Sequence, residues 1–236
     1  MSGHSHWSSI KHQKQTEDLK KSQVFSKISR FITVAVQKQG PTPAGNPALQ
    51  AALDKAKAVN MPAKSVERAI QRAVSRQEGN LEEVVYEAFG PGKTALIIEA
   101  ITDNKNRVRE HLHKILNQTS GKLAEAGSVK WLFEQKGLIH LPESYNLSDD
   151  LELELIEAGA EDIQKQDDHL VIYTKPQDLQ QVVESLEKQG YTIDSSSIGW
   201  VPKETITLKP GDQKKLDNFL QSIEEEDIQE VYTNAS

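Results

Sequence analysis

Residues 84–101 read VVYEAFGPGKTALIIEAI, and this stretch decides the organisation of the chain. Its two apolar runs, Val84–Phe89 and Ala95–Ile101, are joined by Gly90-Pro91-Gly92. Short apolar runs on either side of a turn that contains Gly and Pro predict a β-hairpin. The residues before the hairpin have the periodicity of helices, whereas those after it alternate between strand-like and helix-like segments. The hairpin therefore marks the start of a body that contains β-sheet.

The segment upstream of the hairpin predicts three helices. Apolar residues recur at the spacing of one helix face over residues 17–39, and a glycine then ends that helix. Asn46-Pro47 supplies an N-cap and a first-turn proline for a second helix, and Pro62 opens a third. We expect a flexible basic arm over residues 1–16 and a basic helical domain over residues 17–78.

Downstream of the hairpin, strand-like and helix-like segments alternate with short connections, which is typical of α+β and α/β domains. The predicted fold class is α+β, with an N-terminal three-helix domain followed by two ferredoxin-like α/β domains, the third inserted into the second. The expected boundaries are 79–141 plus 204–236 for the discontinuous domain and 142–203 for the inserted one. Near the junction, two short strands, 129–133 and 138–141, are expected around a turn at Lys136-Gly137.

Charge divides the chain at the same place as periodicity does. The formal net charge is −7. Residues 1–78 contain 13 Lys and Arg against 5 Asp and Glu, a net charge of +8, whereas residues 79–236 contain 15 against 30, a net charge of −15. A basic head on an acidic body predicts that the head binds a polyanion and that the body has another task.

The composition excludes several classes of protein. The chain contains no cysteine, which excludes a disulfide framework, a thiolate metal site and a cysteine nucleophile. No apolar run approaches the roughly 18 residues of a membrane span. Residues 1–14 lack the apolar region of a secretory signal. We therefore expect a cytoplasmic protein that has no membrane partner.

The third predicted helix has the strongest electrostatic pattern. Its basic residues Lys64, Arg68, Arg72 and Arg76 are spaced four apart, and its apolar residues fall on the opposite side. At 100° per residue, the four charges spread over about 120° of the helix surface. Each pair of like charges at this spacing costs roughly 0.2–0.5 kcal/mol, which a bound polyanion would offset. The pattern predicts contact with nucleic acid, and the alternative is a solvated face that aids solubility.

The first helix and the arm supply further candidate residues for binding nucleic acid. Lys20, Lys27, Arg30 and Lys38 fall on one side of the first helix, and Lys11, Lys14 and Lys21 lie in or beside the arm. Trp7 lies in a polar part of the arm, where it either stacks on a base or packs against the helical domain.

Other motifs lack the context that their chemistry requires. Gly92-Lys93-Thr94 ends like a P-loop, but position 87 is Glu instead of Gly and a strand follows, so a hairpin turn explains it better. His111 and His113 point about 200° apart on a helix and cannot share a metal ion. The sequence contains no supported nucleophile–base pair or carboxylate dyad. We expect no enzymatic activity, no metal and no cofactor.

The polar run from Asp103 to Arg107 lies at a strand-to-helix junction and has two interpretations. Asp103 or Asn104 would cap the following helix, because both side chains accept hydrogen bonds from the first helical N–H groups. Alternatively, the run forms a polar surface that contacts RNA or a protein partner.

Several stretches of the chain resemble the YebC/PmpR family. Gly3-His4-Ser5-His6-Trp7, followed by Ile10-Lys11-His12, is similar to the GHSKW…IKH opening of that family, with His6 where Lys is usual. The other matching stretches are Asn46-Pro47, Asn60-Met61-Pro62, Glu67-Arg68-Ala69-Ile70, Tyr86-Glu87 with Gly90-Pro91-Gly92, Thr102-Asp103-Asn104 with Asn106-Arg107, Gly127-Ser128-Val129 with Leu132-Phe133, and Val231-Tyr232 with Asn234. The resemblance covers essentially the whole chain.

The resemblance implies three domains and a role in gene expression. Members of the family are described as DNA-binding transcriptional regulators, and others, including a mitochondrial relative, act in translation on the ribosome or its nascent products. Three functions are therefore considered: a DNA-binding transcriptional regulator, a translation factor that acts on the ribosome through ribosomal RNA, and a protein-interaction scaffold. The partner would be DNA or ribosomal RNA, with the ribosome or the transcription machinery, and the oligomeric state stays open.

Overall fold

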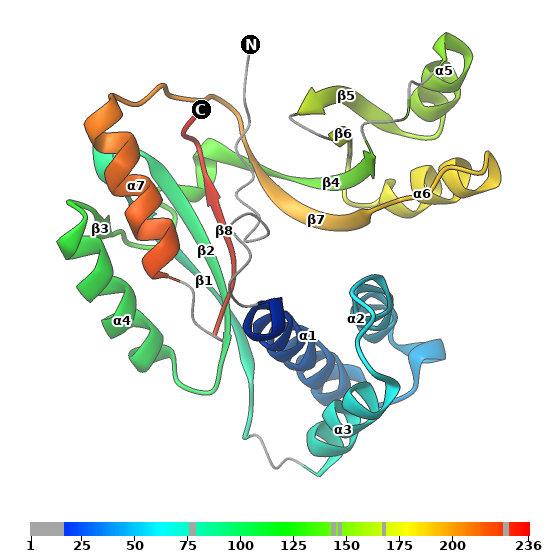
Figure 1. The fold of residues 1–236 in the computed structure, drawn as a ribbon, viewed down its shortest axis with the longest axis horizontal. Coiled ribbons are helices and arrows are strands. Elements are labelled where there is room, and N and C mark those ends of the chain that lie inside the picture. Colours follow the sequence, from blue (N-terminus) through cyan, green and yellow to red (C-terminus); the bar gives the residue numbers. More distant parts are fainter. Residues whose placement is uncertain (1–16, 76–78, 143–144, 146–147, 167–168, 224–226) are drawn as a thin grey trace. The chain divides into compact units, whose positions relative to one another are not determined.

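A computed structural model describes residues 17–75, 79–142, 145, 148–166, 169–223 and 227–236 (Figure 1). The described chain divides into two compact units. The inserted unit comprises residues 132–204, and the discontinuous unit comprises the described residues up to 131 together with residues 205–236. Helices and two antiparallel sheets make the fold α+β, and one sheet unit interrupts the other, which confirms the predicted fold class.

Three helices open the discontinuous unit: α1 (Glu17–Gln39), α2 (Pro47–Ala58) and α3 (Ala63–Val74). α1 packs against both of the others, around a core that includes Ile32, Leu49 and Ala69. The buried Asn46 side chain caps α2, because it accepts a hydrogen bond from the Leu49 N–H at 3.0 Å. The predicted N-cap is therefore confirmed.

The first sheet has the strand order β3-β1-β2-β8. Its elements are β1 (Glu82–Phe89), β2 (Ala95–Thr102), α4 (Lys105–Gln118), β3 (Lys122–Leu123), α7 (Pro210–Ser222) and β8 (Ile228–Thr233). β1 and β2 form the expected hairpin, closed by the short 3-10 turn η2 (Pro91–Lys93). Because a strand follows that turn, the sequence Gly92-Lys93-Thr94 has no helix N-terminus with which to hold phosphate.

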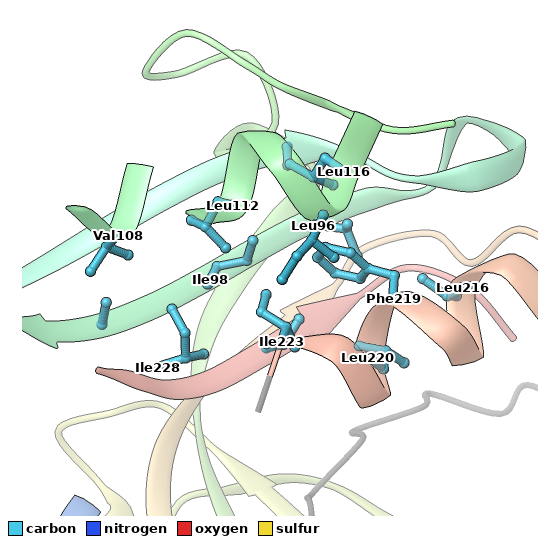
Figure 2. Close-up of a cluster of buried hydrophobic side chains, with 14 of the residues drawn as sticks. Leu96, Ile98, Val108, Leu112, Leu116, Leu216, Phe219, Leu220, Ile223 and Ile228 are labelled. Atoms are coloured by element: carbon cyan, nitrogen blue, oxygen red, sulfur yellow. The ribbon is translucent and has the colours of Figure 1, made fainter. Parts of the chain in front are cut away.

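The helices α4 and α7 cover one face of the first sheet, and Figure 2 shows their apolar side chains meeting those of β2 and β8. The core of this layer includes Leu96, Leu112 and Phe219, all of which are fully buried. Ile101 alternates to the opposite face of β2 and packs with Val34 of α1. The helical segment is therefore attached to the sheet within the same unit.

The inserted unit contains the second sheet, in the order β5-β6-β4-β7. Its elements are β4 (Phe133–Pro142), α5 (Asp149–Glu157), β5 (Ala160–Gln166), β6 (His169–Thr174), α6 (Leu179–Lys188) and β7 (Ser195–Pro202). All three strand pairs are antiparallel, and the βαββαβ order is that of a ferredoxin-like unit. None of the helices that the structure describes is both long and apolar enough to cross a membrane.

The turn predicted at Lys136-Gly137 is wrong. Both residues lie inside the ten-residue strand β4, where Gly137 pairs with Thr174 and Ile198. A Cβ atom at position 137 would collide with the Thr174 hydroxyl and lie 3.0 Å from Leu179 Cβ. The glycine therefore permits a close approach of α6 to the sheet instead of a turn. Since β4 belongs to the second sheet, the inserted unit begins at Leu132 instead of residue 142.

Candidate nucleic-acid interface

The α2–α3 junction positions the basic face of α3. Asn60 adopts a left-handed conformation with φ 54°, and the Met61 N–H donates to the Ala56 carbonyl at 2.9 Å. The Asn60 N–H donates to the Lys57 carbonyl at 2.9 Å, which completes a Schellman C-cap on α2. Pro62 then fixes the entry to α3 at its N-cap position. The start of α3, and hence the direction of each of its side chains, is set by this cap.

Lys64, Arg68 and Arg72 are all exposed, and we call this set the α3 stripe. The buried residues Ala69 and Ala73 lie on the other side of the helix and pack into the helical core. The fourth predicted member, Arg76, lies outside the described residues.

The electrostatic surroundings of Lys64 and Arg68 leave these two members of the α3 stripe cationic. Among the described residues, neither Lys64 nor Arg68 forms an ion pair with a carboxylate. Glu67 is the one acid in α3, and its carboxylate accepts a hydrogen bond from the Gln71 amide at 3.3 Å. Three like charges on one exposed helix face can contact consecutive phosphates of a nucleic acid.

The basic residues of α1 have a different environment from those of α3. Arg30 Nη1 lies 2.9 Å from Asp227 Oδ1 and donates to the Ile101 carbonyl at 3.1 Å. Lys27 Nζ donates to the Gln229 carbonyl at 3.3 Å. The sequence grouped these two cations with the α3 stripe, but the structure uses both to hold α1 against the first sheet. We therefore leave Arg30 and Lys27 out of the candidate interface.

Asp227 is the acid that pairs with Arg30 of α1 and so gives the α1 cations a different environment from the α3 stripe. Its carboxylate is 7% exposed and also lies 2.7 Å from Arg107 Nη2, which contacts Asp103 at 2.8 Å. The hydrogen bond from Arg107 to Asp227, followed by the one to Asp103, raises the pKa of the Arg107 guanidinium. One buried carboxylate thus connects α1, the start of β8 and the first turn of α4.

The run from Asp103 to Arg107 acts as a helix start. Asn104 caps α4 by accepting a hydrogen bond from the Arg107 N–H at 3.1 Å, whereas Asp103 contributes its ion pair instead of the cap. The capping interpretation therefore accounts for Asn104.

The structure describes only some of the other residues that the sequence proposed for nucleic-acid binding. Lys21 is exposed near the start of the described part of α1. Lys11, Lys14 and Trp7, and the side chain of Lys20, lie outside what the structure describes. The structure therefore brings together Lys64, Arg68 and Arg72 and does not unite them with the first-helix set.

Sequence reasoning gave no role to Glu87 beyond its conflict with a P-loop. Its buried carboxylate accepts hydrogen bonds from the N–H groups of Gly127 at 2.6 Å, Val129 at 2.6 Å and Lys130 at 2.8 Å. Burial opposes ionisation, but the three N–H donors outweigh it and hold the pKa of Glu87 below its ordinary value. Glu87 thus fixes the loop that precedes the inserted unit.

Sequence reasoning also missed Trp131, whose side chain is 65% exposed. The available signal was a tryptophan beside a lysine in a Gly- and Ser-containing loop. Within the described part of the chain, no group of three His, Asp or Glu residues is arranged to hold a metal ion.

Two family models match the chain. One, described as the TACO1/YebC protein N-terminal domain, matches residues 5–76, and the other, described as TACO1/YebC second and third domain, matches residues 81–235. The gap between them coincides with the change from helices to sheet and from basic to acidic sequence.

Similar proteins match over nearly the full chain. A curated protein of Pseudothermotoga lettingae is 44% identical and one of Thermotoga maritima is 42% identical. Each match covers 99% of this chain and 93% of the relative, and both relatives are named "Probable transcriptional regulatory protein". The crystal structure of a conserved hypothetical protein from Aquifex aeolicus superposes with a TM-score of 0.88 at 38% identity, covering 98% of this chain and 97% of the other. The chain belongs to the TACO1/YebC family.

Proposed function

We propose that this protein is a cytoplasmic, nucleic-acid-binding regulator of gene expression, and specifically a DNA-binding transcriptional regulator. The observation that carries the proposal is the α3 stripe, in which Lys64, Arg68 and Arg72 are exposed opposite the buried face of the helix. The names of the relatives support a role in transcription. The function is regulatory, not catalytic.

The geometry of the α3 stripe suits phosphate binding. Eight residues separate Lys64 from Arg72, which corresponds to about 12 Å along the helix axis. One DNA strand carries a charge every 3.4 Å or so of duplex axis, so the stripe faces about three phosphates. Phosphate contacts position a protein on nucleic acid without reading its sequence. We therefore expect the α3 stripe to provide affinity that depends weakly on base sequence.

A second candidate function is a translation factor that binds ribosomal RNA. The expected weak dependence on base sequence also suits this candidate, since Glu67 and Gln71, two polar neighbours of the stripe on α3, hydrogen-bond to each other. Double-stranded RNA is recognised mainly through its backbone and shape. A protein-interaction scaffold would remain if neither nucleic acid bound.

Charge reversal of the α3 stripe tests the proposal. Lys64→Glu, Arg68→Glu and Arg72→Glu together should weaken binding to a fluorescent 20-base-pair DNA by about 100-fold or more, because the phosphates would meet three acids. The melting temperature should change little, since all three side chains are exposed.

The matched control reverses three exposed lysines of the inserted unit, Lys175, Lys188 and Lys203. It makes the same change in net charge and should leave affinity within about threefold of the original. Equal losses in both variants would show that only net charge matters, and unchanged binding in the α3 variant would overturn the proposal.

A sucrose gradient of cell lysate, with crosslinking and sequencing of bound nucleic acid, separates the two candidates. Enrichment of a few promoters without a ribosome peak supports transcription. Migration with ribosomes and enrichment of ribosomal RNA supports translation, and those contacts should disappear in the α3 variant.

A further inference from the structure

An acid from the sheet, Glu87, forms hydrogen bonds to the backbone of the loop from Glu125 to Trp131. The Glu87 carboxylate binds three of its backbone N–H groups, and the Ser128 N–H donates to the Glu125 carbonyl at 3.1 Å. The buried Val129 side chain anchors the middle of the loop. The residues that follow, Lys130–Leu132, form a short 3-10 turn. The end of the loop is therefore presented by a fixed backbone.

Trp131 is the residue that this backbone presents. Its indole N–H donates to the Ser128 carbonyl at 3.0 Å, so the polar edge of the ring is already satisfied within the loop. The side chain is nevertheless 65% exposed. An exposed large aromatic ring is informative because soluble proteins usually bury such area. What the indole offers to a partner is its faces, because its one donor is in use.

The charge of the surrounding sequence indicates the kind of partner. Residues 104–131 contain 6 Lys and Arg against 2 Glu, a net charge of +4. The rest of the body, residues 79–103 and 132–236, contains 9 Lys and Arg against 28 Asp and Glu, a net charge of −19. Trp131 thus ends the basic stretch of an acidic body. Of these six cations, Lys105 pairs with Glu82 and Arg107 with Asp103 and Asp227, whereas the exposed Lys130 directly precedes Trp131 in the chain. A cation next to an exposed aromatic ring suits a single-stranded nucleic acid, because the cation meets a phosphate while a base stacks on the ring.

We propose that Trp131 is a stacking platform for an unpaired nucleobase, with Lys130 beside it to meet the adjoining phosphate. This inference rests on the proposed function and extends it, since it gives the protein a second contact, outside the helical segment, that selects single-stranded over paired nucleic acid. A base inside a duplex is already stacked on its neighbours, and it cannot lie on the indole without being unpaired.

The test compares the full chain with Trp131→Ala on a 12-nucleotide single strand and a 12-base-pair duplex. Removal of the platform should weaken single-strand binding about tenfold and leave duplex binding unchanged. Trp131→Phe should retain most of the affinity, because a phenyl ring also stacks. Leu153→Ala is the matched control: Leu153 is 61% exposed but lies in the acidic inserted unit, so its truncation should have no effect.

Quenching of tryptophan fluorescence supplies a second readout, which would not change if Trp131 had only a structural role. The single strand should quench the emission of the original protein more than that of Trp131→Phe, because a stacked base lies against the indole. Single-stranded DNA and RNA are tested in parallel, and the strand with the larger loss identifies the natural source of the base.

Two outcomes would overturn the inference. If Trp131→Ala binds the single strand as tightly as the original, or loses single-strand and duplex binding equally, Trp131 is not a stacking platform. In both cases the charge-reversed α3 variant still reports independently on the proposed function. If the original protein binds no nucleic acid at all, both the inference and the proposed function fail.

Discussion

α1 and α3 both carry several Lys and Arg residues but place them in different environments. On α1, the Arg30 side chain is 18% exposed and pairs with the buried Asp227, and Lys27 donates to a carbonyl of β8. On α3, Lys64, Arg68 and Arg72 are exposed on the face opposite the core. Basic residues of α1 therefore attach that helix to a sheet, whereas those of α3 stay exposed on the surface.

The difference between the two helices comes from an acid that is distant in sequence. Asp227 lies at the start of β8, and it reaches Arg30 only because the last strand of the discontinuous unit returns beside β2. Helical periodicity shows which residues share a face, but it does not show what lies opposite that face. A basic face becomes a candidate binding surface when the fold leaves its side chains exposed.

The largest effect is expected from removing Asp227, the acid that pairs with Arg30 of α1. Asp227→Ala leaves the mostly buried Arg30 without its carboxylate and should lower the free energy of unfolding by about 3 kcal/mol. Urea denaturation followed by circular dichroism measures this loss. Nucleic-acid affinity, measured where the variant is folded, should not fall.

Asp103→Ala is the matched control for that change. Asp103 also contacts Arg107, but its side chain is 49% exposed, so its loss should cost about 0.5 kcal/mol. A loss for Asp227→Ala as small as this would show that the Arg30 contact does not hold α1 to the sheet.

A smaller effect is expected at Glu87. Like Arg30, it is a charged residue whose side chain stabilises the fold from inside instead of binding a partner. Glu87→Gln turns one acceptor oxygen into a donor facing backbone N–H groups and should cost about 2 kcal/mol near pH 7. The folded-state pKa of Glu87 is lowered, so its stabilisation is complete above the ordinary value of 4.5 and is lost as the pH falls through the folded value. The difference in stability between the two proteins should therefore shrink in acid.

Urea denaturation from pH 7 to pH 3 measures this dependence. Glu125→Gln, which changes an exposed acid in the same loop, should follow the profile of the original protein. A constant difference between Glu87→Gln and the original across this range would contradict the role given to the carboxylate.

The smallest effect concerns the exposed end of α1. Lys38 lies 2.5 Å from Glu83, but their side chains are 57% and 51% exposed. Solvent screens such a pair, so Lys38→Ala should change the free energy of unfolding by no more than about 0.5 kcal/mol. A loss of stability above about 1.5 kcal/mol would mean that the exposure of an ion pair on α1 does not predict how much it stabilises the fold.

The parts of the fold that follow local rules could be predicted from the sequence. Asn46-Pro47 signals a helix start and Gly90-Pro91-Gly92 signals a hairpin, and both signals depend on neighbouring residues alone. Gly137 could not be interpreted in this way, because a glycine serves either a turn or a close approach, and α6 decides which. The strand Ala160–Gln166 has few apolar residues to reveal it, since it lies at the edge of its sheet.

The candidate site could be predicted only where its residues act through their own helix. The exposure of Lys64, Arg68 and Arg72 follows from the apolar face of α3. The ion pair of Arg30 depends on Asp227, and the presentation of Trp131 depends on a hydrogen bond to the Ser128 carbonyl and on Glu87 of β1. Tertiary contacts of this kind leave no periodic signal in the sequence.

The salt dependence of nucleic-acid binding tests the central claim most directly. One variant replaces Lys64, Arg68 and Arg72 by Gln, and the other carries Lys27→Gln and Arg30→Gln with Asp227→Asn, so that no carboxylate is left unpaired. Each phosphate contact adds about 0.9 to the slope of log affinity against log salt on duplex DNA. The slope should become shallower by about 3 in the α3 variant and stay unchanged in the α1 variant. An unchanged slope in the α3 variant, with a fall of about 2 in the α1 variant, would contradict the assignment of the interface to α3.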